Sequence, residues 1–265
     1  MESLDDGTKW VRKYHSGPHS EVLVVAFPHA GGSASYYVPL SSALSPRVEL
    51  AAIQYPGRQD RRLEPCIDTI EELANRCYAA LRDRLTVPFA FFGHSMGAVI
   101  AFEVTRRLQR AGALLPLRLF VSGRAAPTRQ FSGGVHLLDD AGLVAELRRV
   151  GGTDARFFDD DELLALILPT TRCDYRAIET YAYQPAEPVR CPIIALAGDA
   201  DPQATVEEMR AWRRETARSF DLHVLPGGHF FLGTATEQVA TIISEALLRE
   251  SFGTSLASAA DGSAA

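Results

Sequence analysis

The chain has 265 residues, of which 46% are apolar and 23% are charged, and its formal net charge is −6 at pH 7. A chain of this length can bury a full hydrophobic core without disulfides or metals to hold the fold together. A net acidic chain without a long basic run argues against a nucleic-acid-binding protein, and the lack of an apolar run of about 18 residues argues against a membrane-spanning one.

Short apolar runs that stop at glycine or proline alternate with segments of helical periodicity. In chain order, the predicted elements are strands at 21–27 and 48–54, a helix at 67–85, a strand at 88–92, a helix at 98–108, strands at 117–121, 191–197 and 220–225, and a helix at 236–249. Strands that are apolar throughout and alternate with helices indicate a parallel sheet covered on both faces. The predicted fold class is therefore α/β, with a mostly parallel central sheet.

We expect one domain over residues 1–250 with an inserted subdomain at 124–184, because sixty residues are too many for a loop. Inside the insert, helical segments at 139–150, 160–168 and 170–183 are predicted to be broken at Gly151-Gly152 and at Pro169. The tail, residues 251–265, is small and polar and is expected to be disordered.

Four scattered cysteines show neither C-x-x-C spacing nor the spacing of a disulfide framework: Cys66, Cys77, Cys173 and Cys191. The N-terminal segment 1–13 is polar and lacks the apolar stretch of a secretory signal. Both observations favour a soluble, reduced protein of the cytoplasm.

The most informative motif is Gly93-His94-Ser95-Met96-Gly97, a G-x-S-x-G between a predicted strand and a predicted helix. This context is typical of a nucleophile elbow, a strained turn in which the serine hydroxyl is exposed at the edge of a sheet. Five-residue patterns also recur by chance, but the flanking strand and helix favour Ser95 as a nucleophile.

A serine nucleophile needs a base, which in this chain order follows the acid. His229 follows the last predicted strand in a Gly-Gly-His loop and is the preferred base. His136 precedes the candidate acids, His223 lies within a predicted strand, and His94 lies within the elbow itself, where a structural role is expected.

The acid is expected in Gly198-Asp199-Ala200-Asp201-Pro202, directly after a predicted strand. Asp201 is preferred because Pro202 would fix its loop, and Asp199 is the alternative. A solvated acidic turn is the ordinary role of either residue. The acid would orient the imidazole and stabilise the imidazolium.

Two backbone N–H groups are expected to stabilise the oxyanion. One belongs to Met96, the residue after the nucleophile. The other is assigned to Ala30, in the loop Pro28-His29-Ala30-Gly31-Gly32 that follows the first predicted buried strand. The glycines of this loop could also simply form a turn.

Several motifs occur together in one order: F-P-H-A-G-G at 27–32, Y-P-G-R at 55–58, G-H-S-M-G at 93–97, G-G-T at 151–153, L-P at 168–169, G-D-x-D-P at 198–202 and G-G-H-F at 227–230. With this set the chain resembles the bacterial type II thioesterases, the stand-alone editing enzymes of polyketide and non-ribosomal peptide biosynthesis. The resemblance spans about residues 10–249, and P-H-A-G-G and Y-P-G-R are its most specific parts. Asp154 departs from it, because a proline is expected there.

The resemblance implies an α/β-hydrolase fold in which 124–184 forms a helical lid. It implies Ser95, Asp201 and His229 as a catalytic triad, with Ala30 and Met96 as oxyanion donors. It also implies a substrate carried as a thioester on the phosphopantetheine arm of an acyl- or peptidyl-carrier protein. We expect no cofactor, no metal and a monomer.

Three other functions stay open: a serine esterase or lipase acting on free acyl esters, an acyltransferase or cyclase, and a non-catalytic partner of a synthase. The motifs argue against the first, and a complete triad argues against the last. Two arginine groups, 58/61/62 and 106/107/110, could meet an acidic carrier, although solvated surface arginines are the preferred interpretation. Leu164, Leu168 and Phe158 could line an acyl channel or form the core of the insert.

Overall fold

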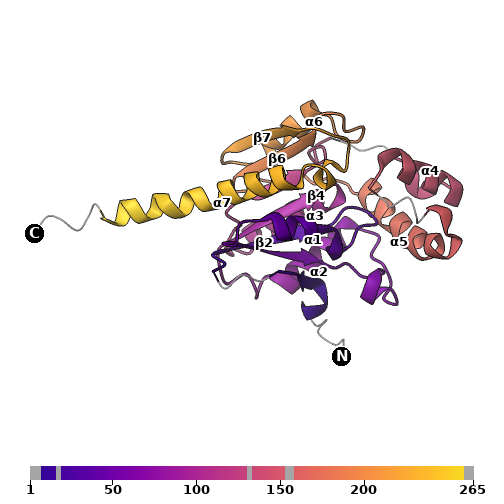
Figure 1. Ribbon diagram of the computed structural model, residues 1–265, viewed down its shortest axis with the longest axis horizontal. Coiled ribbons are helices and arrows are strands. Elements are labelled where there is room, and N and C mark those ends of the chain that lie inside the picture. Colours follow the sequence, from indigo (N-terminus) through magenta and orange to yellow (C-terminus); the bar gives the residue numbers. More distant parts are fainter. Residues whose placement is uncertain (1–6, 16–18, 130–132, 153–157, 260–265) are drawn as a thin grey trace, which may run out of the picture.

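The computed structural model describes residues 7–15, 19–129, 133–152 and 158–259 (Figure 1). Within these residues, seven strands form one sheet in the order β1-β3-β2-β4-β5-β6-β7. The strands are β1 Val11–Lys13, β2 Val22–Phe27, β3 Val48–Ile53, β4 Phe89–His94, β5 Leu119–Ser122, β6 Ile193–Gly198 and β7 Phe220–Leu225. All neighbours are parallel except β1, which is antiparallel to β3. The α/β class with a mostly parallel sheet is confirmed.

Helices cover both faces of the sheet, which explains why its strands are apolar throughout. The helices are α1 Val38–Ala43, α2 Ile70–Leu81, α3 Met96–Arg110, α4 Asp140–Val150, α5 Asp161–Glu179, α6 Val206–Arg210 and α7 Thr236–Ala259. On β4, Phe89 and Phe91 belong to the core that α2 and α3 cover. Ala90 and Phe92, which point to the opposite face, belong to the core covered by α1 and α7.

The edge strand β1 has no counterpart among the predicted strands. It has three residues, pairs Val11 with Ile53, and has a partly exposed burial pattern. A strand this short carries no periodicity by which it could be distinguished from a loop.

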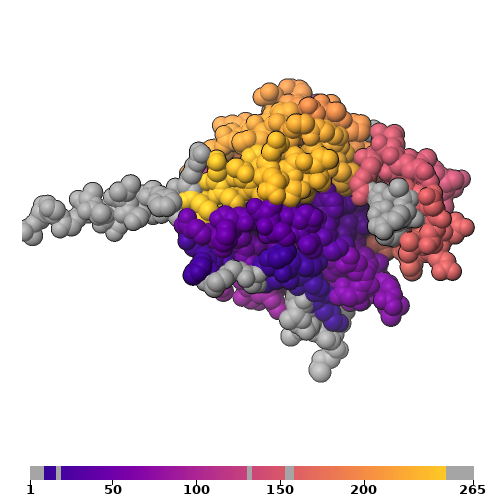
Figure 2. Space-filling model, in the orientation of Figure 1, coloured from indigo at the N-terminus to yellow at the C-terminus, as the bar shows by residue number. Residues whose placement is uncertain are grey.

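Helices α4 and α5 form a separate lobe beside the sheet, inserted between β5 and β6 (Figures 1 and 2). The predicted break at Pro169 is wrong, because α5 continues through it as one helix of 19 residues. An interior proline costs roughly 3 kcal/mol. The neighbouring side chains of Leu168, Thr170 and Thr171 are buried, and their burial offsets this cost.

The C-terminal helix α7 continues to Ala259, about ten residues beyond its predicted end. The disorder expected for residues 251–265 stays a prediction. Residues 260–265, like Asp154, lie outside the described part of the chain.

Cys66 and Cys173 form a disulfide whose Cα atoms lie 6.6 Å apart, so the expectation of a chain without disulfides is wrong. The two cysteines are 107 residues apart in sequence, and no local spacing could have indicated the pair. Cys77 and Cys191 are buried free thiols, and burial raises the pKa of Cys191 to about 12.

Among the described residues, no helix has the length and apolar character needed to cross a membrane.

Candidate active site

Ser95 occupies a strained turn between β4 and α3. Its backbone has φ +53° and ψ −119°, a conformation that non-glycine residues seldom adopt. Glycine is required on both sides of this turn. A Cβ on Gly93 would lie 2.3 Å from the carbonyl oxygen of Gly97, and a Cβ on Gly97 would lie 2.0 Å from the carbonyl oxygen of Phe27. The strand–turn–helix geometry of the predicted elbow is therefore present.

His229 and Asp201 meet because β6 and β7 are parallel neighbours, with Gly198 opposite Leu225, so the loops that follow them emerge side by side. The His229 Nδ1 atom lies 3.0 Å from Asp201 Oδ2 and 3.1 Å from Oδ1. The Asp201 side chain is fully buried, and the backbone N–H of Gln203 donates to its Oδ1 at 2.7 Å.

The alternative acid, Asp199, has a different partner. Its Oδ1 accepts a hydrogen bond from the backbone N–H of Gly227 at 2.9 Å, which ties the two loops together. Of the two carboxylates in this loop, the structure therefore brings Asp201, and not Asp199, to the imidazole of His229.

The other candidate histidines lie elsewhere. His136 is paired with Glu179 of the lid, and His223 lies within β7 opposite Leu196. His94 is fully buried beside the elbow, where its Nδ1 lies 2.9 Å from the Oγ atom of Ser122.

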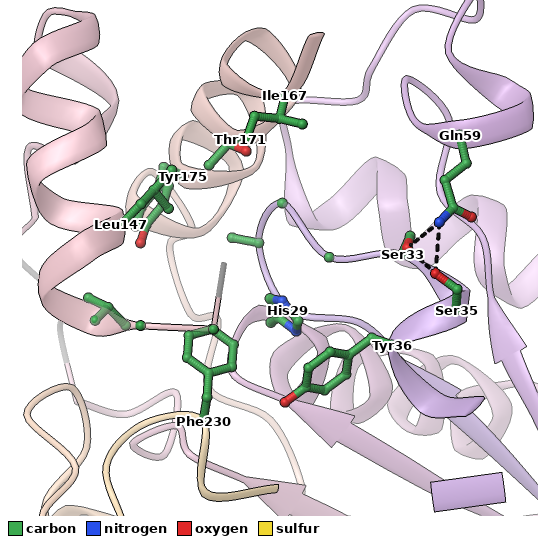
Figure 3. Close-up of a pocket in the computed structure, with 16 residues that line it drawn as sticks. His29, Ser33, Ser35, Tyr36, Gln59, Leu147, Ile167, Thr171, Tyr175 and Phe230 are labelled. Atoms are coloured by element: carbon green, nitrogen blue, oxygen red, sulfur yellow. Dashed lines mark hydrogen bonds between the residues drawn. The ribbon is translucent and has the colours of Figure 1, made fainter. Parts of the chain in front are cut away.

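Ser95, His229 and Ala30 line one small cavity under the lid. A second cavity of about 350 Å³ shares His29, Ala30 and Phe230 with it. In Figure 3, lid side chains face core side chains across this second cavity: Leu147, Ile167, Thr171 and Tyr175 on the lid, and His29, Tyr36 and Phe230 on the core.

The lid side chains suggested for a channel have different roles. Leu168 belongs to the core of the lid, with Phe158 and Leu164 packed against it. Ile167 lines the cavity instead, and Leu147 both belongs to the lid core and lines the cavity. Successive residues of a helix point in different directions, so the neighbours Ile167 and Leu168 of α5 face the cavity and the core of the lid, respectively.

The proposed oxyanion donors are Met96, which follows Ser95 in the chain, and Ala30, which lines the same cavity as Ser95. Met96 is the first residue of α3, so its N–H is among those that have no acceptor within the helix. Ala30 lies in a tight turn after β2, which is closed by a 2.9 Å hydrogen bond from the Gly32 N–H to the carbonyl of His29.

Two buried histidines next to His229 are kept neutral. Burial is the main reason that the pKa of His29 is lowered to about 3, and nearby His229 and Arg58 lower it further. Burial also lowers the pKa of His94, with smaller contributions from His229 and His29. Arg124 lines the same cavity as Ser95, and burial lowers its pKa to about 10, so it stays charged at pH 7.

Three of the arginines considered for carrier binding are buried in ion pairs, so the preferred interpretation as solvated surface groups is wrong for them. Arg58, Arg61 and Arg106 are each at most 7% exposed. Their respective partners are Asp174, Glu64 and Glu103. Sequence reasoning missed these roles because two partners lie three residues away, as in any exposed helical pair, and the third is 116 residues away.

Within the described residues, no group of three His, Cys, Asp or Glu side chains is arranged to hold a metal ion.

A model of the thioesterase domain family matches residues 23–247. Thioesterase PikA5 of Streptomyces venezuelae is 48% identical over 252 residues, which cover 93% of this chain and 88% of the relative. The solved structure of the type II thioesterase BorB, from the borrelidin biosynthetic cluster, is 49% identical with a TM-score of 0.84, covering 90% of this chain and 98% of that one. The RedJ thioesterase, from the prodiginine pathway of Streptomyces coelicolor, is 37% identical with a TM-score of 0.84, covering 89% and 95%. These matches extend over nearly the whole chain, which therefore belongs to the thioesterase domain family, as a serine hydrolase that acts on thioesters.

Proposed function

We propose that this enzyme hydrolyses acyl groups from the phosphopantetheine arm of acyl- or peptidyl-carrier proteins, and so clears misloaded chains in polyketide or non-ribosomal peptide biosynthesis. The observation that carries this proposal is Ser95 on a strained elbow, in one cavity with a His229 held by a buried Asp201. The relatives named for borrelidin and prodiginine biosynthesis support the choice of substrate.

In the proposed mechanism, Ser95 Oγ attacks the thioester carbonyl carbon while His229 Nε2 takes the hydroxyl proton. The backbone N–H groups of Ala30 and Met96 donate to the resulting oxyanion. Collapse of this intermediate breaks the C–S bond, and the proton on His229 passes to the carrier thiolate.

The acyl-enzyme is then hydrolysed by a second pass through the same groups. His229 takes a proton from water, the hydroxide attacks the acyl carbon, and Ser95 leaves with the proton returned. Asp201 accepts a hydrogen bond from Nδ1–H throughout, which keeps Nε2 available as the base. No step needs a cofactor or a metal, and we propose that none is used.

The second cavity, which shares His29, Ala30 and Phe230 with the small cavity of Ser95, supports short acyl groups as substrates. Its volume of about 350 Å³ is at the low end of small-molecule pockets. We also propose that the enzyme acts as a monomer. A cytoplasmic location remains part of the proposal.

The test is a panel of carrier proteins loaded with acetyl, butyryl, octanoyl and aminoacyl groups, compared with free oxygen esters of the same acids. We expect carrier thioesters to be hydrolysed with the higher kcat/KM and to release the free acid. Ser95→Ala should abolish release. Equal or faster hydrolysis of the free oxygen esters would favour a general esterase. Transfer of the acyl group to an amine or alcohol in place of water would favour an acyltransferase.

A further inference from the structure

Three side chains of helix α5 attach the lid to two loops of the core. Thr170 Oγ1 donates to the carbonyl of Gly57 at 2.6 Å, Cys173 is bonded to Cys66, and Asp174 pairs with Arg58. Because they are spaced i, i+3 and i+4, all three lie on one face of the helix. The middle of α5 is therefore fixed to the loop that follows β3.

Asp174 reaches beyond that loop to the turn that contains Ala30. Its Oδ2 accepts hydrogen bonds from the backbone N–H of Gly31 at 2.8 Å and from Arg58 Nη1 at 2.7 Å, and its Oδ1 accepts from Arg58 Nη2 at 2.9 Å. Arg58 Nη1 also donates to the carbonyl of Gly32 at 3.0 Å. The carboxylate is fully buried and the guanidinium is 7% exposed, so water competes little for these bonds.

These bonds determine the direction of the Ala30 N–H. That N–H shares a rigid peptide plane with the carbonyl of His29 and points the opposite way. The His29 carbonyl is held by the N–H of Gly32 at 2.9 Å. Gly32 is in turn held by Arg58, and Gly31, in the left-handed region at φ +74°, is held by Asp174.

We propose that Asp174 and Arg58 are positioning residues for the oxyanion site, through which lid helix α5 orients the Ala30 N–H toward the developing oxyanion. The inference rests on the proposed function only in taking Ala30 as an oxyanion donor. This positioning role differs from simple anchoring of the lid. Thr170 anchors the lid as well, but it does so through Gly57 and not through the Ala30 turn.

The experiment compares Asp174→Asn with Thr170→Val, which removes a neighbouring attachment of the same helix. An asparagine amide nitrogen cannot accept a hydrogen bond, so in either orientation of the amide the variant loses the bond from the Gly31 N–H or a bond from Arg58, and both bonds hold the turn. Deleting an oxyanion donor outright costs about 10²–10³ in kcat. Misdirecting one should cost less, and we expect Asp174→Asn to lower kcat by about 10–100-fold with KM within twofold. Thr170→Val should change kcat by less than threefold.

Affinity for a boronic acid that mimics the tetrahedral adduct provides a second readout, which lid anchoring alone would not change selectively. It should weaken in Asp174→Asn by about the same factor as kcat/KM falls, whereas affinity for the product acid should not change. Arg58→Lys keeps the charge but loses the two-pronged pairing, so it should fall between wild type and Asp174→Asn. It also serves as the test if Asp174→Asn does not fold.

The rate at which a fluorophosphonate labels Ser95 separates this inference from the proposed function, since it needs no natural substrate. Labelling should slow in Asp174→Asn relative to Thr170→Val even if carrier thioesters are not the substrate. Equal effects of the two variants on kcat, on boronate affinity and on labelling would overturn the inference.

Discussion

Replacing Asp201 with asparagine tests the assignment of the acid most directly. In the structure, Asp201 Oδ1 accepts the Gln203 N–H at 2.7 Å, and Oδ2 lies nearer to His229 Nδ1, at 3.0 Å. An asparagine that keeps its oxygen on Gln203 must place its NH₂ group toward Nδ1. Nδ1 would then act as the acceptor, which leaves the proton on Nε2 and removes the base.

The expected loss is large because the carboxylate is fully buried and no water can replace it. The same exchange in a serine protease costs about 10⁴ in kcat, or about 5 kcal/mol in the barrier. We expect a loss of about 10³–10⁴, because Oδ1 also lies within reach of Nδ1, at 3.1 Å, and can hold part of the population in the productive tautomer.

Asp199→Asn is the matched control. Its amide oxygen can still accept from the Gly227 N–H, so kcat should change by less than about threefold. The assay is thiol release from an acyl N-acetylcysteamine thioester, with circular dichroism to verify the fold of each variant. A loss of under tenfold for Asp201→Asn, or a larger loss for Asp199→Asn, would refute the reasoning.

Three further results are expected. Gly97→Ala should destabilise the protein by about 2–4 kcal/mol in urea unfolding, because its Cβ would lie 2.0 Å from the Phe27 carbonyl oxygen, whereas Gly233→Ala, which meets nothing within 4 Å, should cost under 1 kcal/mol. Because the pKa of His29 is lowered to about 3, the stability that the neutral side chain contributes is complete above the unfolded pKa of about 6.5 and decreases as the pH falls, with about 2 kcal/mol lost at pH 5. His29→Phe should remove this pH dependence, so a difference in unfolding free energy between wild type and variant that is the same at pH 7.5 and pH 5 would contradict the prediction. Ile167→Trp should lower kcat/KM for octanoyl relative to acetyl thioesters by about tenfold, and an unchanged ratio would exclude this wall of the cavity from selectivity.

The sheet and the nucleophile could be predicted because their signals are local. Each buried parallel strand is a short apolar run that ends at glycine or proline, and the elbow needs glycines at fixed positions around Ser95. The preference for Asp201 over Asp199 came from Pro202, one residue away. Its contact with His229 depends on the register of β6 and β7, which the sequence does not reveal.

The features that escaped prediction depend on contacts between distant segments. Arg58 looks like a surface arginine until α5 places Asp174 against it, and Cys66 meets Cys173 for the same reason. Local propensity predicts that a helix ends at Pro169. Burial of its neighbours outweighed that propensity, as tertiary packing often does.

The position of the lid in the chain, between β5 and β6, has a consequence for evolution and engineering. Strand β5 lies between β4 and β6, the strands that lead to Ser95 and Asp201, yet it carries neither of them. A segment inserted after β5 can therefore change in length and sequence while the reacting groups keep their places. The replaceable module ends at Pro169, however, because the next turns of α5 support the Ala30 turn. A chimera whose junction lies before Thr170 would exchange the selectivity of the lid and keep the native support of the Ala30 turn. A chimera whose junction lies after Asp174 would combine the Ala30 turn of one parent with the supporting Asp174 of the other.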